Sequence, residues 1–416
     1  MIKKIFRLGG VFSGLGIIWI RTLWRRNRKT DPAQGLERIL VLGHAAIGDC
    51  IFLLPALRCL RALFPEARIV FMAPRYPTTE ELIPATGLVD EIWEFGAEHA
   101  ERDKPEICGR IKRGRFDAVV MSHATPARLY LPAILNIPLR VGHCRPLTAP
   151  HKGWSFGRYV LWRLRRGLIS DEFERRLALN RKVWVAEDAE HTVSRNLRLI
   201  QALDVDLPLA ADSPPKLLET PEQAGLAEKS MEGIDRSRAV GLHVGSPKSQ
   251  YGKIWPAEKW ALVCRKLSER HGVQIVLVGG PDEEDQAGRF LAALDAPCLN
   301  LVGRLGLMET FAVVRRCRLL IGNDTGLSKA AMAMGVPAAV VWGPSDRPGY
   351  GVFWDKEKHL EIFRPLLCSP CVSMGLRAEG AGVINFATCG HHACLEELTA
   401  NEVFSAVSAK YGSFFS

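Results

Sequence analysis

Short apolar runs alternate with helix-like stretches along much of the chain. The first run is RILVLG at 38–43, and it leads through the loop HAAIGD into a helical pattern that continues to Phe64. Further apolar runs occupy 68–72, 89–95, 116–121 and 139–142. Apolar, β-branched runs of this length that alternate with helices predict a parallel α/β sheet.

A second series of the same kind begins with AVGLHVG at Ala239. It predicts helices over 256–271, after Pro281 and over 325–334, and strands over 274–278, 318–322 and 337–342. Open parallel sheets bind their ligands at the carboxyl ends of the strands. We therefore predict an α/β protein with two Rossmann-like, doubly wound domains in tandem.

The pattern also predicts where the domains begin and end. We place an N-terminal domain at 36–207 and a C-terminal domain at 215–398, because the stretch between them is rich in Pro, Ala and Asp. A C-terminal helix and tail follow at 398–416. Residues 145–190 are rich in Arg and Trp and interrupt the alternation, so we interpret them as an insertion.

Composition restricts the class of protein. With 416 residues and 47% hydrophobic content, the chain is long enough for two buried cores. Its 55 Lys and Arg exceed its 45 Asp and Glu, and the net charge of +10 favours anionic partners such as nucleotides, phosphorylated glycans or acidic lipids. No zinc-finger spacing, RNA-recognition signature or heptad-coupled basic region occurs, so we expect no nucleic-acid partner.

The eleven cysteines indicate a reducing compartment. Seven of them lie scattered in apolar or helical stretches, as buried free thiols do in cytosolic proteins. The other four are Cys368, Cys371, Cys389 and Cys394. A C-x-x-C followed by a second close pair can surround one tetrahedral ion, so this cluster at 368–394 predicts structural zinc or iron; buried free cysteines are the alternative.

The first thirty residues combine an apolar run, Leu8 to Ile20, with basic residues on both sides. A bilayer span needs about 20 apolar residues, so this run is too short to cross a membrane. We interpret residues 1–30 as an anchor in an anionic membrane surface, with a helix packed on the protein or a disordered start as the alternatives. The expected location is the cytoplasm, peripherally on the inner membrane.

Four loops that connect a strand to a helix carry candidate chemistry. In the first, Gly48 and Asp49 stand at the start of a helix, where the Asp49 carboxylate either accepts a proton from a substrate or caps the helix. In the second, Ser246 begins a basic loop in which Lys253 offers a point charge to phosphate. In the third, Asp282 or Glu283 offers an acceptor to ribose hydroxyls.

The fourth loop reads GNDTGLSKAA. It places Asp324, Thr325 and Gly326 between an apolar strand and a helix, with Leu327 and Lys329 in the first turn. Free backbone N–H groups and the positive end of the helix dipole suit a diphosphate there. A plain helix cap is the alternative. The sequence also contains Asp-x-Asp at 204–206, but it lies in a polar stretch between the domains, so we expect no metal–diphosphate role for it.

Taken together, HAAIGDCIFLLPALRCLRALFP, HVG…KIWPAEKW, VGGPDEED and IGNDTGLSKAAMAMGVP resemble the ADP-heptose:lipopolysaccharide heptosyltransferases over roughly residues 36–409. The resemblance implies the GT-B fold, with two domains facing a central cleft. It also implies transfer of heptose from ADP-heptose, with inversion and without a catalytic metal, to a lipopolysaccharide core acceptor.

The resemblance also implies roles for individual residues. Asp49 matches the general base, Lys253 a lysine near the donor phosphates, Asp282 or Glu283 the ribose contact, and Asp324 to Gly326 the diphosphate-binding turn. Lys329 stands where the family commonly has His. A lysine keeps a positive charge near the diphosphate, but unlike histidine it does not readily exchange a proton at neutral pH.

Other functions remain open at this stage. The acceptor could be a protein hydroxyl or another glycan, with 145–190 as its reader, and the donor another nucleotide sugar. A catalytically silent member that binds nucleotide or lipid as an assembly factor is the rival from another class. An NAD-dependent oxidoreductase is disfavoured because no G-x-G-x-x-G follows the first strand.

Overall fold

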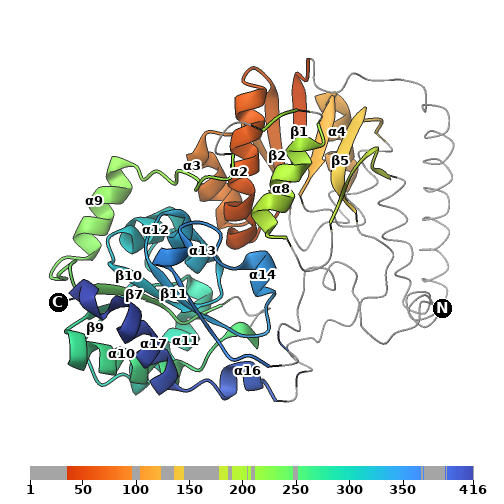
Figure 1. Cartoon of the computed structure of the whole chain (residues 1–416). Coiled ribbons are helices and arrows are strands. Elements are labelled where there is room, and N and C mark those ends of the chain that lie inside the picture. The colour runs from red at the N-terminus through yellow and green to blue at the C-terminus, as the bar shows by residue number, and fades with distance from the viewer. Residues whose placement is uncertain are drawn as a thin grey trace, which may run out of the picture. The chain divides into compact units, whose positions relative to one another are not determined.

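The computed structural model describes residues 35–95, 104–122, 135–144, 178–185, 190–203, 205–207, 211–246, 252–366, 369, 389 and 391–415. They form two compact units, the first built mainly from residues up to Asp212 and the second mainly from Ser213 onward (Figure 1). Within the described ranges, every helix is too short or too polar to cross a bilayer.

The first unit contains a six-stranded parallel sheet in the order β3-β2-β1-β4-β5-β6. Its strands are β1 (Arg38–Leu42), β2 (Arg68–Pro74), β3 (Glu91–Phe95), β4 (Ala118–Met121), β5 (Leu139–Cys144) and β6 (Arg181–Trp184). The helices of this unit are α2 (Ile47–Leu63), η1 (Thr78–Leu82), α3 (Ile83–Thr86), α4 (Lys104–Gly114) and α8 (Thr192–Gln201). β1 is a central strand, with β2 paired on one side of it and β4 on the other, so the order of the strands reverses at β1.

The second unit repeats this order, read from the other edge, as β12-β11-β10-β7-β8-β9. Its strands are β7 (Ala239–His243), β8 (Gln274–Leu277), β9 (Cys298–Asn300), β10 (Leu319–Asn323), β11 (Ala338–Trp342) and β12 (Leu360–Phe363). Its helices are α9 (Pro221–Ser230), α10 (Ala257–His271), η3 (Pro281–Glu283), α11 (Glu284–Ala293), α12 (Leu307–Arg315), α13 (Gly326–Ala333), α14 (Arg347–Tyr350), η4 (Lys356–Lys358), α16 (Ala393–Glu396), α17 (Ala400–Tyr411) and η6 (Gly412–Phe415). All neighbouring strands pair in parallel.

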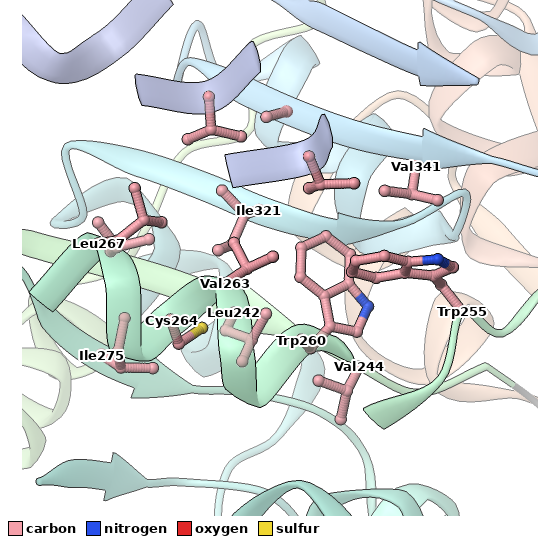
Figure 2. Close-up of a cluster of buried hydrophobic side chains, with 14 of the residues drawn as sticks. Leu242, Val244, Trp255, Trp260, Val263, Cys264, Leu267, Ile275, Ile321 and Val341 are labelled. Atoms are coloured by element: carbon pink, nitrogen blue, oxygen red, sulfur yellow. The ribbon is translucent and has the colours of Figure 1, made fainter. Parts of the chain in front are cut away.

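Continuous apolar strands explain why these sheets form. Every residue of β7, β10 and β11 is buried, as expected for strands with helices on both faces of the sheet. On one face, α10 packs its apolar side into a large core cluster (Figure 2). The indole rings of Trp255 and Trp260 meet edge to face there, with centroids 4.8 Å apart.

Local sequence fixes where two helices of the second unit begin and end. Thr399 caps α17 by accepting from the Glu402 backbone N–H, while the Glu402 side chain accepts from the Thr399 backbone. These reciprocal bonds form a capping box, which fixes the start of a helix. Helix α10 ends at His271, and the next residue, Gly272, has a φ of 63°, in the left-handed region that glycine adopts most easily.

The predicted fold class of two doubly wound α/β sheets is confirmed. One part of the prediction is wrong. Residues 181–184, which lie in the stretch interpreted as an insertion, form β6 and pair with β5, while Ala178 and Leu179 belong to the core of the first unit. The sheet therefore includes the end of that stretch.

Candidate active site

The candidate site of the second unit lies where the strand order reverses. The chain leaves β7 toward β8 on one side and adds β10 on the other, so the carboxyl ends of β7 and β10 flank a topological switch point. Open α/β sheets bind ligands in the crevice outside this point. The residues that follow β7, β8 and β10 supply the polar groups described next.

Asp324 is the centre of a buried cluster of charges. Its Oδ1 accepts a hydrogen bond from Lys329 Nζ at 2.7 Å, and its Oδ2 accepts one from Lys253 Nζ at 3.2 Å. Burial by itself would raise the pKa of the Asp324 carboxyl, but the two lysines outweigh burial and hold that pKa far below its usual range. Asp324 is therefore an anion shared by two cations.

Lys329 is enclosed more completely than Lys253. Only 4% of its side chain is exposed, against 13% for Lys253. Its ammonium lies 4.0 Å from the centre of the Trp342 ring, within the range of a cation–π interaction. Burial lowers the pKa of Lys329, while Asp324 opposes that change. Lys253 is thus the cation of the pair that is better placed to reach a ligand.

This arrangement suits an anion. Two lysines face one carboxylate, so the cluster carries a net positive charge, and the first turn of α13 begins at Gly326 directly after it. Free N–H groups and the dipole at a helix N-terminus attract phosphate. Nearby, Ser246 is buried, and its hydroxyl has no hydrogen-bond partner among the described residues.

A second chain of hydrogen bonds passes through His243 at the end of β7. Its Nδ1 lies 2.9 Å from Thr325 Oγ1, and its Nε2 lies 2.8 Å from Glu283 Oε2. The same Glu283 oxygen accepts a bond from the Gly280 backbone N–H at 2.9 Å. Burial opposes ionisation of Glu283, but His243 and this amide together keep the pKa of Glu283 below its ordinary value. The chain links the loop after β8 to the start of α13.

Two glycines make room for the Glu283 carboxylate. A Cβ at Gly245 would lie 2.4 Å from the Glu283 carboxyl carbon, and one at Gly279 would lie 2.5 Å from Oε2. A side chain at either position would force the Glu283 carboxylate to move. The glycines after β7 and β8 therefore have a specific function, because they allow an acidic side chain to lie between two strand ends.

Asn323 fixes the loop that carries Lys253. Its Oδ1 accepts from the Trp255 backbone N–H at 3.1 Å and from Trp260 Nε1 at 3.3 Å, and its Nδ2 donates to the Val244 carbonyl at 2.8 Å. The side chain is fully buried and uses both ends of its amide. It joins β10 to the end of β7, to α10 through Trp260, and to Trp255, which lies two residues after Lys253.

The structure brings five of the predicted residues into two hydrogen-bonded groups, and it places Asp282 and Leu327 outside them. Lys253, Asp324 and Lys329 form the charge cluster, and Thr325 and Glu283 form the His243 chain. Between the two acidic alternatives, Glu283 is buried in this network whereas Asp282 is exposed. Leu327 is buried in α13 and offers only apolar contact.

Helix α2 begins at Ile47, so Gly48 and Asp49 lie within its first turn and Asp49 is not the N-cap residue. Capping of the free N–H groups of this turn by the Asp49 side chain stays a prediction. The role of Asp49 as a base also stays a prediction.

Sequence reasoning gave no role to His243 or Asn323. Both were visible as polar residues at the last position of an apolar strand, in GLHVG and LLIGND. A polar residue at that position lies at the ligand-binding edge of a parallel sheet, and this position could have indicated a role for both residues. Their hydrogen-bond partners lie in loops distant in sequence and could not be predicted.

The predicted metal site is only partly within the described residues. Cys368 and Cys371 lie outside them, while Cys394 packs in the core and Cys389 accepts a hydrogen bond from the His392 backbone N–H. In the part of the chain that the structure describes, no three His, Cys, Asp or Glu side chains are grouped so as to hold a metal ion. The zinc or iron site stays a prediction.

Comparison with known proteins decides the family. The model of glycosyltransferase family 9 (heptosyltransferase) matches residues 163–381, just over half of the 416 residues. The chain belongs to this family. It is therefore a glycosyltransferase, as predicted. Lipopolysaccharide heptosyltransferase 2 of Salmonella typhimurium is 27% identical over 330 residues, which cover 74% of this chain and 83% of the relative.

Solved structures support the fold of this family 9 member. The ADP-heptose lipopolysaccharide heptosyltransferase II of Escherichia coli superposes with a TM-score of 0.64 at 22% identity, over 90% of this chain and 98% of its own. A family 9 glycosyltransferase from Veillonella parvula gives 0.65 at 20% identity, over 91% and 99%. The predicted GT-B class is confirmed.

Proposed function

We propose that this enzyme transfers a heptose from ADP-heptose to a sugar hydroxyl of a lipopolysaccharide core acceptor, with inversion at the anomeric carbon. The proposal combines family membership with a site suited to a nucleoside diphosphate. The relatives named lipopolysaccharide heptosyltransferase 2 in S. typhimurium and E. coli support this donor sugar and acceptor.

One observation carries the proposal. Asp324, Lys253 and Lys329 form a buried cluster of net positive charge directly before α13, at the switch point of the second sheet. A diphosphate brings several negative charges, which the lysines and the helix N-terminus are suited to receive. Glu283 at the neighbouring strand end suits the hydroxyls of a ribose.

The proposed chemistry is a single displacement. Asp49 removes the proton from an acceptor hydroxyl, whose oxygen forms a bond to the anomeric carbon as the bond from that carbon to the ADP oxygen breaks. The departing diphosphate gains negative charge, which Lys253 and the backbone N–H group of Gly326 at the start of α13 stabilise, while the Thr325 N–H donates to the Ser328 hydroxyl. Because these groups can receive the negative charge of the leaving group, we expect the transfer to proceed without a catalytic metal.

The test is a matched screen of donors and acceptors. Purified enzyme is incubated with ADP-heptose, ADP-glucose, UDP-glucose or GDP-mannose, and with a detergent-dispersed core acceptor that lacks heptose or with protein acceptors. We expect ADP release and a mass increase of one heptose on the core acceptor, with the product linkage inverted by NMR. Tight nucleotide retention without turnover on any pair would instead identify a binding protein.

We also propose that residues 1–30, which lie outside the described residues, hold the enzyme on the cytoplasmic face of the inner membrane. The sequence supplies an apolar run and flanking basic residues, and two such signals are what stable attachment requires. Deletion of 1–30 should leave the enzyme in the supernatant of a vesicle sedimentation assay while activity on dispersed acceptor survives. A truncated enzyme that still sediments with anionic vesicles would contradict the anchor.

A further inference from the structure

His243 lies between two parts of the donor site that come from different strands. Its Nε2 faces Glu283 in the turn after β8, and its Nδ1 faces Thr325 at the start of α13. We propose that His243 is a positioning residue that holds the Glu283 carboxylate so that its second oxygen recognises the ribose of the donor. This inference rests on the proposed function, because it assumes a nucleoside diphosphate at this site.

The two oxygens of Glu283 have different surroundings. Both hydrogen bonds that Glu283 accepts, from His243 Nε2 and from the Gly280 N–H, go to Oε2. Oε1 accepts no hydrogen bond within the described part of the chain, although the side chain is only 11% exposed. One oxygen is thus fixed by the protein while the other remains available to a ligand donor. A ribose diol supplies such donors.

The direction of the hydrogen bonds follows from the charges. An ionised carboxylate only accepts, so the hydrogen between His243 Nε2 and Glu283 belongs to the ring. His243 Nδ1 also forms a hydrogen bond with Thr325 Oγ1, in which either the ring nitrogen or the hydroxyl is the donor. His243 is therefore held at both nitrogens, and a ring fixed at both ends can orient the carboxylate that it contacts.

Few other side chains fix the orientation of Glu283. Gly245 and Gly279 pack closely against the carboxylate but offer it no side-chain donor, and no salt bridge to Lys or Arg restrains it in the described part of the chain. A carboxylate that turned away would lose its alignment to the ribose before any ligand arrived. Holding it in place removes an ordering cost from binding, so His243 raises affinity specifically for a ligand with ribose hydroxyls.

Two conservative substitutions separate the two contacts of His243. In His243→Gln, the side-chain amide can reach the position of Nε2 and donate to Glu283. In His243→Asn, the shorter amide can reach the position of Nδ1 and contact Thr325, but not Glu283. The experiment measures by calorimetry the Kd of ADP, 2′-deoxy-ADP and 3′-deoxy-ADP for wild type and both variants, with thermal melting to confirm folding.

Wild type should bind at least one deoxy form about tenfold or more weakly than ADP, because a hydrogen bond to a charged acceptor is lost. In His243→Asn this preference should fall toward one, chiefly through weaker ADP binding. In His243→Gln it should persist, even if all three nucleotides bind less tightly. Glu283→Gln serves as the reference for a weakened acceptor and should also reduce the preference.

The outcomes distinguish the two proposals. If His243→Asn weakens all three nucleotides equally and keeps the wild-type preference, His243 has only a structural role and the inference is wrong. If wild type binds ADP without preferring it over either deoxy form, Glu283 does not contact the ribose and the inference is also wrong, while the proposed function survives. If wild type binds no ADP, GDP or UDP, the proposed function itself fails.

Discussion

The two units of the chain build the same sheet but bury different side chains. Among the described residues of the first unit, the buried polar ones are Thr78, Thr79, Thr192, Arg195 and Asn196, of which one, Arg195, carries a charge. The second unit also buries residues that carry or can carry a charge, namely His243, Glu283, Asp324, Lys329, Asp346 and His359. A common topology thus defines where a ligand can bind, while the side chains at the strand ends define which ligand it is.

The difference has an energetic consequence. Burying charged groups costs free energy that pairing only partly returns, so a cluster such as Asp324 with two lysines is poor evidence of stabilisation. Its position at the switch point of the second sheet indicates a functional reason for keeping it. Among its described residues, the first unit, with the same strand order, buries one charged side chain, Arg195, and no comparable cluster. If this contrast is functional, substitutions at the buried charges of the second unit should affect nucleotide binding and stability, and substitutions in the first unit should not affect them in the same way.

The largest expected effect concerns catalysis by the first turn of α2, which follows β1 of the first sheet. Asp49→Asn should lower kcat by about 10² to 10⁴ because a general base is lost, while ADP affinity stays close to that of wild type. Steady-state kinetics and calorimetry on the same preparation measure both quantities. Turnover near that of wild type would remove Asp49 from the mechanism and shift the chemistry to the second unit.

The next largest effect should follow from breaking the buried charge cluster. Asp324→Ala leaves Lys253 and Lys329 without their shared anion, and removing one partner of a buried pair costs about 3–5 kcal/mol of unfolding free energy. Arg75→Ala, which breaks an exposed pair with Glu94 in the first unit, is the matched control and should cause no measurable change. Urea denaturation compares the two. Equal stability of both variants would contradict the contrast between the units.

The third effect is a pH dependence of the unfolding free energy that arises from a buried histidine of the second unit. His359 in the second unit is buried, neither ring nitrogen has a hydrogen-bond partner among the described residues, and burial lowers its pKa from 6.5 to about 4. Between these values the unfolded chain binds a proton that the folded chain does not, so the unfolding free energy falls as pH falls. The full loss is about 3 kcal/mol.

The control for this pH effect is His359→Leu, which removes the titrating ring and keeps an apolar group of similar size. Denaturation at pH 4 and pH 7 should show a smaller loss of stability in this variant than in wild type. If the two proteins lose the same unfolding free energy on acidification, other groups account for the pH dependence.

The smallest effect concerns one phosphate contact. Lys253→Ala should weaken ADP binding about tenfold, because a point charge near the diphosphate is lost while Lys329 and the helix N-terminus remain. Lys266→Ala is the control, since this lysine of α10 lies over the Phe404 ring rather than at the strand ends. Calorimetry should find its ADP affinity unchanged. An equal loss in both variants would point to a general effect of charge.

The sequence predicted nine of the strands, and those it missed share one property. β6, β9 and β12 lie at edges of their sheets, and none has a fully buried run of residues. In β6, RKVW, only Val183 is buried, and two of the four residues are charged. The segment therefore has no apolar run by which a strand could be predicted. An edge strand has one neighbour and less burial, and it therefore leaves a weaker apolar signal.

The sequence by itself determined the two doubly wound sheets and the strand-to-helix loops that form the candidate site, because apolar periodicity and strand-to-helix turns are local properties. It left Asp282 and Glu283 equivalent, and it left His243 and Asn323 without roles. Only the tertiary structure decided these points. Parallel strands distant in sequence bring their carboxyl ends together, and His243 meets Glu283 and Thr325 there, forty and eighty-two residues away along the chain. Partners so far apart leave no periodic trace in the sequence.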